Sequence, residues 1–371
     1  MSQPFAVLAA GGTGGHVFPA EALASELLAR GWRLALVTDK RGHAYGGTLG
    51  SLETFRISAG GIAGRGLLPK VRAVFELGIG VIQARGLLGR LRPTALIGFG
   101  GYASVPTMVA GTMLGIPTAI HEQNAVLGRA NRLLAGRVRR IATSYSHVEH
   151  LDPAWHRKVV QTGMPVRAAV AAQREATYPP LDAEGPVDLL VLGGSQGARV
   201  LSEVVPAALA RLPHSLRERI RISQQCRPED LEGVRAAYAG TGIQATLESF
   251  FSDVPERMAA AHLVIARSGA STVAELTALG RPAILVPYPH AIDDHQTANA
   301  RAVDEAGGAW LMPQSAFTAD SLASRLESLL TQPGTLVRAA GCARAAARPD
   351  AAARLADLVA ALPGHRQESL P

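Results

Sequence analysis

Apolar and polar positions alternate in two ways along the first forty residues. Residues 5–9 (FAVLA) are an apolar run, whereas from Pro19 to Leu28 apolar side chains recur every three or four positions. The first pattern predicts a strand and the second a helix with one buried face. Pro19 suits a first helical turn, and Gly31 suits the position after the last turn. A further apolar run over 32–40 completes a strand–helix–strand unit, which predicts a parallel sheet.

The same order of strand, glycine loop and helix recurs further along the chain. It is found over 94–115, over 187–212 and over 262–280, and apolar strands occupy 115–124 and 281–290. The second of these repeats resembles the N-terminal segment in kind and begins about half a chain later. We therefore predict an α/β fold with two Rossmann-like parallel-sheet domains facing a cleft.

Domain boundaries follow from a break in this pattern. Residues 168–186 are rich in proline and polar side chains, which predicts a linker, and the tail from about Thr318 is helical and rich in alanine. We expect an N-terminal domain over 1–164 and a C-terminal domain over 165–344. A last helix over about 345–362 is expected to pack back on the first domain.

Composition restricts the class of protein. The 371 residues are 47% hydrophobic and 18% charged, so a large core can form and disorder is not expected. Two cysteines, Cys226 and Cys342, give no disulfide framework and favour a reducing compartment. Neither a signal peptide nor an apolar stretch long enough to span a bilayer is visible, which predicts a cytosolic protein.

The charge balance is basic. A net charge of +7 suits an anionic partner, such as a phosphorylated substrate or an acidic membrane surface. The basic residues are mostly arginines scattered through alanine- and glycine-rich sequence, with no basic run that contains aromatic residues. Nucleic acid is therefore not expected as a partner.

Three glycine-rich segments lie between predicted strands and predicted helices: GGTGGH (11–16), GGSQGA (193–198) and RSGAST (267–272). A helix N-terminus attracts anions, because its first four N–H groups lack intrahelical partners and its dipole is positive there. Known nucleotide fingerprints fit poorly, since the dinucleotide pattern needs a glycine where Val17 stands and the dipeptide Gly-Lys is absent. One such loop alone could be a tight turn that requires glycine. Three together indicate contact with phosphate or sugar.

One of these loops permits a different chemistry. Residues 193–197 match G-x-S-x-G, the nucleophile elbow of α/β-hydrolases, with Ser195 as the nucleophile. Asp293, Asp294 and His295 could supply the remaining members of a triad. This alternative leaves the matching loop of the first half unexplained.

Six segments taken in order resemble the MurG family of N-acetylglucosaminyltransferases. They are GGTGGHVFPA, GFGGYASVP, HEQNAVLGRANR, GGSQGAR, RSGASTVAEL and HAIDDHQTANA, and the resemblance extends from the first loop to about Trp310. It implies a GT-B fold with an acceptor- and membrane-side N-terminal domain and a UDP-sugar-binding C-terminal domain.

The resemblance implies a reaction and a location. N-acetylglucosamine would pass with inversion from UDP-N-acetylglucosamine to the C4 hydroxyl of the muramoyl sugar of lipid I (undecaprenyl-pyrophosphoryl-muramoyl-pentapeptide). The product would be lipid II, for peptidoglycan synthesis. The implied location is peripheral, at the cytoplasmic face of the bacterial inner membrane, with other cell-wall synthesis proteins as further candidate partners.

The resemblance also implies roles for particular residues. His16 is the candidate base that takes the proton from the attacking hydroxyl, and Glu122 is the second candidate. The structural alternatives are that His16 caps its loop and that Glu122 is a solvated loop carboxylate. Tyr102 and Asn131 are expected on the acceptor side. Contacts with UDP-N-acetylglucosamine are expected at Thr13, Gly14, Gly15, Asn124, Arg167, Ser195, Phe251, Ala270, Ser271, Thr272, Val273, Ala274, Glu275 and Gln296.

Three members of this set carry more specific expectations. Arg167 would stabilise the charge of the donor diphosphate, and Ser195 would donate its hydroxyl to it. Arg167 ends GMPVR, where the family often has Gly-Asn-Pro-Val-Arg, so Met164 departs from the family pattern. The family uses Glu275 for the ribose hydroxyls, but Thr272 and Glu275 also form a T-x-x-E capping box, which is a structural alternative.

The leaving diphosphate raises the question of a metal. Many glycosyltransferases hold a metal with Asp-x-Asp, and no two aspartates of this chain have that spacing. Helix N-termini and Arg167 would then neutralise the diphosphate. We therefore expect catalysis without a metal and without a cofactor.

Residues 64–93 mix apolar and basic side chains. This combination suits an anionic membrane surface, while the structural alternative is an amphipathic helix packed on the sheet. The apolar members are Leu67, Leu68, Val71, Val74, Phe75 and Ile79, and the basic ones are Arg65, Lys70, Arg72, Arg85, Arg90 and Arg92.

Three alternatives to the implied function stay open. A GT-B lipid glycosyltransferase with diacylglycerol as acceptor would carry the same donor motifs. The others are the serine hydrolase and a sugar-nucleotide binding protein without turnover. Transfer assays with lipid I or diacylglycerol, fluorophosphonate labelling of Ser195, and substitution of His16 distinguish them.

Overall fold

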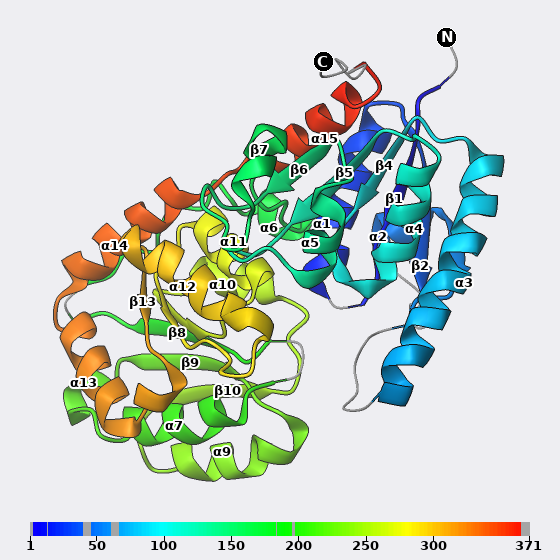
Figure 1. Cartoon of the computed structure of the whole chain (residues 1–371). Helices are drawn as coiled ribbons and strands as arrows, with labels where there is room; N and C mark the ends of the chain where they lie inside the picture. The colour runs from blue at the N-terminus through cyan, green and yellow to red at the C-terminus, as the bar shows by residue number, and fades with distance from the viewer. Residues whose placement is uncertain are drawn as a thin grey trace. The chain divides into compact units, whose positions relative to one another are not determined.

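The chain divides into two compact units, as seen in a computed structural model. The N-terminal unit consists of residues 1–167 and 348–371, and the C-terminal unit of residues 168–347. The structure describes residues 3–12, 14–39, 46–60, 67–182, 184–194 and 197–364, with the backbone alone for 67–73. Each unit is a parallel sheet flanked by helices (Figure 1). The two-sheet α/β fold predicted from the apolar pattern is confirmed.

The sheet of the N-terminal unit has seven strands in the order β3-β2-β1-β4-β5-β6-β7, all parallel. The strand order reverses direction between β1 and β4. The strands are β1 (Phe5–Ala9), β2 (Arg33–Asp39), β3 (Glu53–Ile57), β4 (Ala95–Gly98), β5 (Thr118–Glu122), β6 (Arg140–Thr143) and β7 (Val159–Gln161).

Helices cover both faces of this sheet, because side chains from successive strand positions point to opposite faces. On one face Val7 and Ile120 pack with helices α3 (Leu67–Leu91), α4 (Gly101–Met113) and α5 (Arg129–Ala135). On the other face Leu8 and Ile97 pack with α1 (Gly14–Ala29) and α15 (Ala351–Ala361). The last helix of the chain is thus part of the N-terminal core. The remaining helices of this unit are the short α2 (Gly47–Gly50) and η1 (Pro153–Lys158).

Helix α1 begins earlier than its proline suggested. It starts at Gly14, so Pro19 lies inside the helix and not in its first turn, and that expectation is wrong. Proline lacks the N–H that would bond to the carbonyl four residues earlier. The predicted end is confirmed: Gly31 has a φ of 78° and donates its N–H to the Leu28 carbonyl at 2.9 Å.

The sheet of the C-terminal unit has six parallel strands in the order β10-β9-β8-β11-β12-β13. They are β8 (Val187–Leu192), β9 (Ile220–Gln225), β10 (Gln244–Glu248), β11 (Leu263–Ala266), β12 (Ala283–Leu285) and β13 (Ala309–Leu311). The helices are α6 (Ala168–Ala172), α7 (Arg199–Leu209), α8 (His214–Arg217), η2 (Pro228–Asp230), α9 (Leu231–Tyr238), α10 (Val254–Ala260), α11 (Ala270–Leu279), η3 (Ile292–Asp294), α12 (His295–Glu305), η4 (Gln314–Ala316), α13 (Ala319–Leu330) and α14 (Pro333–Ala346).

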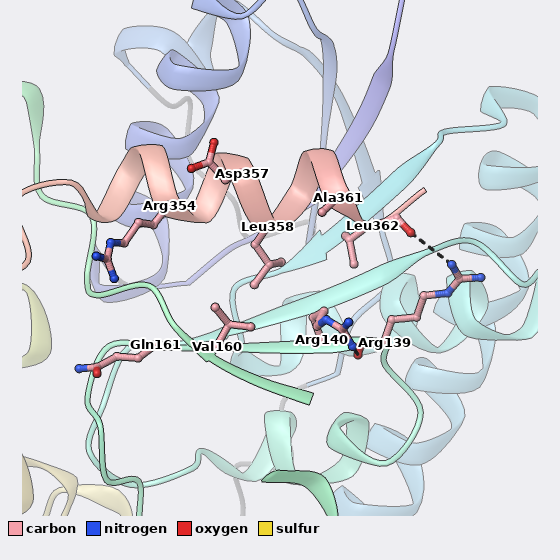
Figure 2. A pocket seen from close by; sticks show the side chains of 9 residues that line it. All are labelled: Arg139, Arg140, Val160, Gln161, Arg354, Asp357, Leu358, Ala361 and Leu362. Atoms are coloured by element: carbon pink, nitrogen blue, oxygen red, sulfur yellow. Dashed lines mark hydrogen bonds between the residues drawn. The ribbon is translucent and has the colours of Figure 1, made fainter. Parts of the chain in front are cut away.

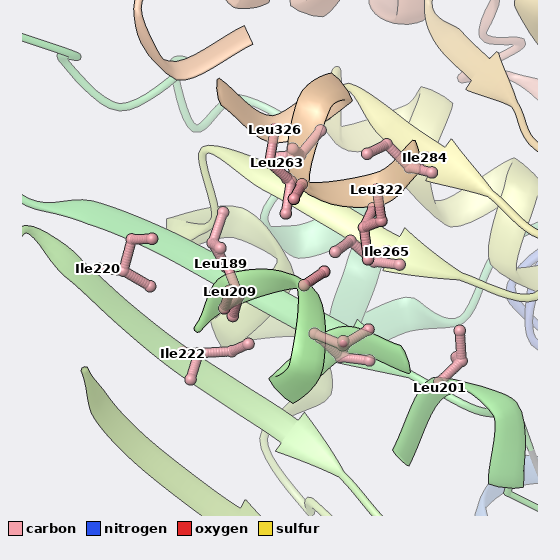
Figure 3. Packing of buried hydrophobic residues seen from close by; sticks show 14 of the residues in the cluster. Leu189, Leu201, Leu209, Ile220, Ile222, Leu263, Ile265, Ile284, Leu322 and Leu326 are labelled. Carbon is pink, nitrogen blue, oxygen red and sulfur yellow. The ribbon is translucent and has the colours of Figure 1, made fainter. Parts of the chain in front are cut away.

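Aliphatic side chains fill the space between this sheet and its helices. Figure 3 shows Leu189 and Ile265 from the sheet beside Leu209 of α7 and Leu322 of α13. These four side chains are almost fully buried. The sheet and the two helices therefore share one apolar core, which fixes the ends of the strands that carry the C-terminal site.

The segment 168–186, predicted to be a linker, is held to the C-terminal unit by hydrogen bonds. The guanidinium of Arg281, which is fully buried, donates to the carbonyl of Thr177 at 2.9 Å and to that of Ala259 at 2.7 Å. The Tyr178 hydroxyl donates to the His262 carbonyl at 2.8 Å. The segment begins with the short helix α6, and the described residues of its proline-rich part, 173–186, have no regular secondary structure but are held in place by hydrogen bonds.

In both sheets the strand order reverses next to a central strand, β1 in the first and β8 in the second. Loops at the carboxyl ends of parallel strands diverge at such a point, and ligands of open α/β sheets bind there. All three predicted glycine loops follow strands that border these points: β1, β8 and β11. Within the described residues, no helix is long and apolar enough to span a bilayer.

Candidate active site

Three loops meet at the switch point of the N-terminal unit. They follow β1, β4 and β5, and they carry His16, the pair Gly100–Gly101, and the segment from Glu122 to Asn124. The first glycine loop is shaped by packing: a Cβ on Gly11 would lie 2.8 Å from the Ala103 Cβ. The loop therefore lies directly on helix α4, which brings His16 to the neighbouring glycine pair.

The half-buried imidazole of His16 lies in the first turn of α1, against the backbone between β4 and α4. A Cβ built on Gly101 would lie 3.3 Å from His16 Nε2, and one on Gly100 would lie 3.6 Å from His16 Nδ1. Both glycines have positive φ, 81° at Gly100 and 67° at Gly101. Glycine is thus required here both for backbone conformation and for the room that the imidazole occupies.

The buried amide of Gln123 holds the other side of His16. Its Oε1 lies 3.2 Å from His16 Nδ1, and its Nε2 donates to the Phe99 carbonyl at 2.9 Å. Nε2 also lies 3.1 Å from Nδ1 of His121, a histidine with no exposed surface. Burial lowers the pKa of His121 to about 4, so it is neutral around pH 7. The sequence interpretation assigned no role to Gln123 or His121.

Glu122, the second candidate base, is buried and receives four hydrogen bonds. Its Oε1 accepts from the backbone N–H of Asn124 at 3.0 Å and from Asn124 Nδ2 at 3.2 Å. Its Oε2 accepts from the Gly128 N–H and from Asn131 Nδ2, both at 2.8 Å. This geometry favours a carboxylate that shapes the 123–131 segment over one that receives a substrate proton, and the solvated-loop alternative does not fit it.

The remaining predicted residues of this unit lie around these loops. Asn131 is buried, and its Oδ1 finds no hydrogen-bond partner among the described residues. Tyr102 is half-buried in the first turn of α4. The guanidinium of Arg167 lies 5.1 Å from the ring centroid of Phe18 of α1. Gly14 and Gly15 open α1, whereas Thr13 lies outside the described residues.

In the C-terminal unit the predicted donor residues gather at the N-terminus of α11. The helix begins at Ala270 with Gly269 as its N-cap and without a side-chain cap. Thr272 therefore lies inside the helix, and the alternative that Thr272 and Glu275 form a capping box is wrong. The first-turn N–H groups at Ala270, Ser271 and Thr272 precede any intrahelical acceptor and can bind an anion.

Two hydroxyl groups beside this helix end reinforce its polarity. The Oγ atoms of Ser268 and Ser271 are buried and have no hydrogen-bond partner in the described part of the chain. The backbone carbonyl of Ser268, in contrast, accepts from Asn299 Nδ2 at 3.1 Å. Buried polar atoms normally have a hydrogen-bond partner. Two buried hydroxyl groups without one, next to N–H groups that have no intrahelical acceptor, therefore favour a polar ligand at this helix end.

Phe251 and Gln296, the other predicted donor residues, precede and follow α11 in the sequence. Phe251 is buried, and the guanidinium of Arg257 lies 4.3 Å from its ring centroid. Arg257 also donates to Asp253 Oδ1 and to Ser223 Oγ, each at 2.8 Å. Gln296 Oε1 accepts the Tyr288 N–H at 2.9 Å, which anchors the start of α12. Val273, Ala274 and Glu275 follow within α11, and Ser195 lies outside the described residues.

The structure also contains hollows that none of the predicted site residues lines. One, of about 390 Å³, lies between α15 and the β6–β7 edge of the N-terminal unit. Figure 2 shows Leu358 of α15 directed toward Val160, and Arg139 donating to the carbonyl of Leu362, the residue that follows the helix. Another, of about 550 Å³, lies over β8, β9 and β10 and includes Arg257. The candidate site is thus defined by convergent polar groups and not by either of these hollows.

Comparison with known proteins decides the family. Residues 6–143 match the Glycosyltransferase family 28 N-terminal domain, and residues 188–355 match the Glycosyltransferase family 28 C-terminal domain. A protein of Paramagnetospirillum magneticum is 74% identical over 97% of this chain and 97% of its own length. It is named UDP-N-acetylglucosamine--N-acetylmuramyl-(pentapeptide) pyrophosphoryl-undecaprenol N-acetylglucosamine transferase. The crystal structure of Acinetobacter baumannii MurG is 30% identical, with a TM-score of 0.78 over 96% of this chain and 99% of that one.

The chain belongs to the MurG family. A second relative of the same name, from Rhodospirillum rubrum, is 62% identical over 98% of this chain and 93% of its own length. Membership of the MurG family confirms the predicted GT-B class of fold and makes the chain a glycosyltransferase. The family 28 match spans residues 193–197, which counts against a serine nucleophile elbow there.

Sequence reasoning missed several residues that contact the predicted site residues. Gln123 is part of HEQN and directly follows β5. The alternation of an extended backbone places its side chain on the same face as that of buried His121, two residues earlier. Gly100 and Gly101 were visible as a pair after a predicted strand, a pattern that often marks close backbone approach. Arg257, four residues after Asp253, offered only an i,i+4 charge pair as a signal.

Proposed function

We propose that this chain transfers N-acetylglucosamine from UDP-N-acetylglucosamine to the C4 hydroxyl of the muramoyl sugar of lipid I. The proposal is carried by His16, which lies at the switch point of the N-terminal unit with its Nδ1 beside Gln123 and its Nε2 beside Gly101. The 74% identity to a relative named for this transfer supports the same choice of substrates.

The proposed step is a single displacement with inversion. The acceptor C4 oxygen forms a bond to the anomeric carbon as the bond from that carbon to the UDP oxygen breaks. His16 takes the hydroxyl proton, and UDP leaves with the electron pair of the broken bond. A positioned general base contributes about 10²- to 10⁴-fold to such a step.

The donor is proposed to bind at the N-terminus of α11. The first-turn N–H groups from Ala270 to Thr272 and the hydroxyl of Ser271 would receive the diphosphate, with Arg167 as the cationic partner. Phe251 would hold the uracil through its main chain, Glu275 the ribose hydroxyls, and Gln296 and Asn124 the sugar. We propose that the reaction needs no metal, because fixed N–H dipoles neutralise the leaving group.

Glu122 is proposed to position and not to act as base. Three of its four hydrogen bonds hold Asn124 and Asn131, the two amides expected at the donor sugar and at the acceptor, and the fourth holds the backbone of Gly128. A carboxylate that already accepts four donors has no lone pair directed at an incoming hydroxyl.

A peripheral location at the cytoplasmic membrane face is proposed for the N-terminal unit. Helix α3 exposes Phe75 (69%) and Ile82 (74%), and Val74 beside them is 62% exposed. Arg85 and Arg90 are exposed near the C-terminal end of the same helix. The side chains of Leu67, Leu68, Lys70, Val71 and Arg72, and all of Arg65, lie outside what the structure describes.

The reaction is tested with purified protein, labelled UDP-N-acetylglucosamine and a lipid I analogue. The expected product is the disaccharide lipid, formed at an unchanged rate in excess chelator. His16→Asn is expected to lower kcat by about 10²- to 10⁴-fold while UDP binding is retained. Transfer to diacylglycerol and not to lipid I, or full activity of His16→Asn, would overturn the proposed acceptor or the proposed base respectively.

A further inference from the structure

A chain of hydrogen bonds extends from His16 into the interior of the N-terminal unit, through Gln123 and His121 to the carbonyl of Gly163. We infer that Gln123 is a positioning residue that fixes the tautomer of His16, with the proton on Nδ1 and the basic lone pair on Nε2. The inference rests on the proposed role of His16 as base and adds the reason why Nε2 is the basic nitrogen.

The orientation of the Gln123 amide is decided by its surroundings. Two backbone carbonyls lie at one end of it: Nε2 is 2.9 Å from the Phe99 oxygen and 3.0 Å from the His121 oxygen. Carbonyl oxygens only accept, so the NH₂ group must be at that end. The amide oxygen therefore faces His16, 3.2 Å from Nδ1. Since Oε1 can only accept, His16 Nδ1 must carry a hydrogen.

The hydrogen bonds of His121, at the far end of this series, are consistent with this orientation of the Gln123 amide. His121 Nε2 lies 3.1 Å from the Gly163 carbonyl, so Nε2 is the nitrogen of His121 that carries a hydrogen. Its Nδ1 is then an acceptor, 3.1 Å from the NH₂ group of Gln123. His121 must stay neutral for this, and burial, which lowers its pKa to about 4, keeps it neutral. The two hydrogens of the Gln123 NH₂ group are shared among three acceptors, the carbonyls of Phe99 and His121 and Nδ1 of His121.

The consequence at His16 follows from the chemistry of neutral imidazole. One ring nitrogen is a donor and the other an acceptor. With Nδ1 donating to Gln123, the lone pair is on Nε2, on the ring edge that borders Gly101. The same ring with its proton on Nε2 could not accept the acceptor hydroxyl proton there. Gln123 thus selects the form of His16 that is competent as a base, without contact with substrate.

A serine-protease triad gives a scale for losing such a partner, since the wrong histidine tautomer costs about 10⁴ in kcat there. An amide oxygen is a weaker acceptor than a carboxylate, and orienting partners of functional histidines typically contribute about 10- to 100-fold. We therefore expect Gln123→Met to lower kcat by about 10- to 100-fold, with KM for the donor changed by less than about threefold, because the sugar contacts remain.

The direct test is the tautomer itself. Wild-type protein is labelled with ¹⁵N-histidine, and two-bond ¹⁵N–¹H correlation spectra are recorded at a pH where His16 is neutral. The His16 signals are assigned by their absence in His16→Asn. A protonated Nδ1 and an unprotonated Nε2 are expected in wild type, and a shift toward a protonated Nε2 in Gln123→Met. A protonated Nε2 at His16 in wild type would overturn the inference, and so would an unchanged tautomer in Gln123→Met.

A matched variant separates positioning from a loss of stability. Gln224 of the C-terminal unit is also a fully buried glutamine, with its Oε1 accepting from the Tyr238 hydroxyl at 2.7 Å. Gln224→Met is expected to be destabilised like Gln123→Met but to keep kcat. Equal loss of kcat in both would overturn the inference.

If His16→Asn keeps full activity, the proposed base fails, whereas the tautomer spectra still decide the role of Gln123. The wild-type spectrum decides it even if Gln123→Met does not fold.

Discussion

The imidazole of His16 lies directly against the backbone of Gly101, with its Nε2 only 3.3 Å from the place where a Cβ would be. Gly101 opens helix α4 with a φ of 67°. The loop after β4 thus forms one wall of the position that His16 occupies, and Gln123 forms the other. The two contacts together restrict the imidazole to one place.

Gly101→Ala is expected to displace His16 and lower kcat. The added methyl group lies within contact distance of Nε2 and Cδ2, and a misplacement of about 1 Å can cost about 10²-fold in rate. The left-handed backbone adds a stability cost of about 1 to 2 kcal/mol. Steady-state kinetics of lipid I glycosylation measure the first effect, and thermal unfolding measures the second.

Gly115 provides the control at the other end of α4. It has a φ of 69° and nothing within 4 Å of an added Cβ. Gly115→Ala is expected to be destabilised about as much as Gly101→Ala, yet to retain kcat. If the two variants lose the same activity, backbone strain alone explains the result and the contact with His16 is irrelevant.

Glu122→Gln is expected to destabilise the N-terminal unit by about 2 to 4 kcal/mol. The new NH₂ group would face two N–H donors, leaving buried hydrogen-bonding groups unsatisfied. Urea unfolding measures the loss. Glu26→Gln is the control, because Glu26 forms a surface ion pair with Arg30, and its loss is expected to lower the free energy of unfolding by less than about 1 kcal/mol. If Glu122→Gln is as stable as wild type but inactive, Glu122 and not His16 would be favoured as the base.

His121 is expected to make the stability of the N-terminal unit fall below neutral pH. Burial lowers its pKa from 6.5 to about 4, so the unfolded chain binds a proton before the folded chain does. Its contribution is complete above pH 6.5 and is lost as the pH falls toward 4. Between pH 7.5 and pH 5 the loss is about 2 kcal/mol.

Urea unfolding of wild type and His121→Phe at both pH values isolates this contribution. The variant lacks the titrating group, so its stability should fall less on acidification. His214→Asn serves as the control, since His214 is on the surface with its side chain 69% exposed, and should keep the wild-type pH dependence. An equal fall in wild type and His121→Phe would show that His121 titrates normally in the folded protein.

The sequence was sufficient for the elements that depend on local patterns. Apolar runs such as 5–9 predict strands because a buried parallel strand requires them, and Gly31 marks a helix end because a positive φ is needed there. The start of α1 was misplaced because Pro19 is a first-turn signal only when the residues before it are not already helical. Gly14 and Gly15 are poor helix formers, yet they are helical here.

The site could be predicted only in part, because its geometry depends on strands that are distant in sequence. His16 was found as the residue after a glycine loop. The contacts of His16 with Gln123 and Gly101 could not be predicted from the sequence, because they depend on the register of β1, β4 and β5, which brings three loops together. The T-x-x-E pattern at Thr272 allowed a cap as an alternative, but α11 begins at Ala270, three residues before the helix start that a Thr272 cap would give.

Arg257→Met is expected to weaken binding of UDP by about 3- to 10-fold. The guanidinium lies over the ring of Phe251 and links it to Asp253 and Ser223, so its loss frees the segment proposed to hold uracil. A cation–π contact of this kind is worth about 0.5 to 2 kcal/mol. Isothermal titration with UDP measures the change.

The control is Arg221→Met, which breaks a bidentate surface pair with Asp188 in the same unit and should leave UDP affinity unchanged. Equal weakening in both would contradict a role for the Phe251 contact.

Phe75→Ser combined with Ile82→Ser is expected to reduce binding to anionic vesicles by about tenfold or more. The two side chains are seven residues apart on α3, hence on one face, and both are largely exposed. Full burial of such a side chain is worth about 1.5 to 3 kcal/mol, and each nearby arginine adds about 1 kcal/mol on an anionic surface.

Co-sedimentation with vesicles of phosphatidylglycerol and phosphatidylcholine measures binding, and vesicles of phosphatidylcholine alone should bind wild type less. Val337→Ser, which removes a half-exposed valine from α14 of the C-terminal unit, should bind like wild type. Undiminished binding of the double variant would place the membrane contact on another surface.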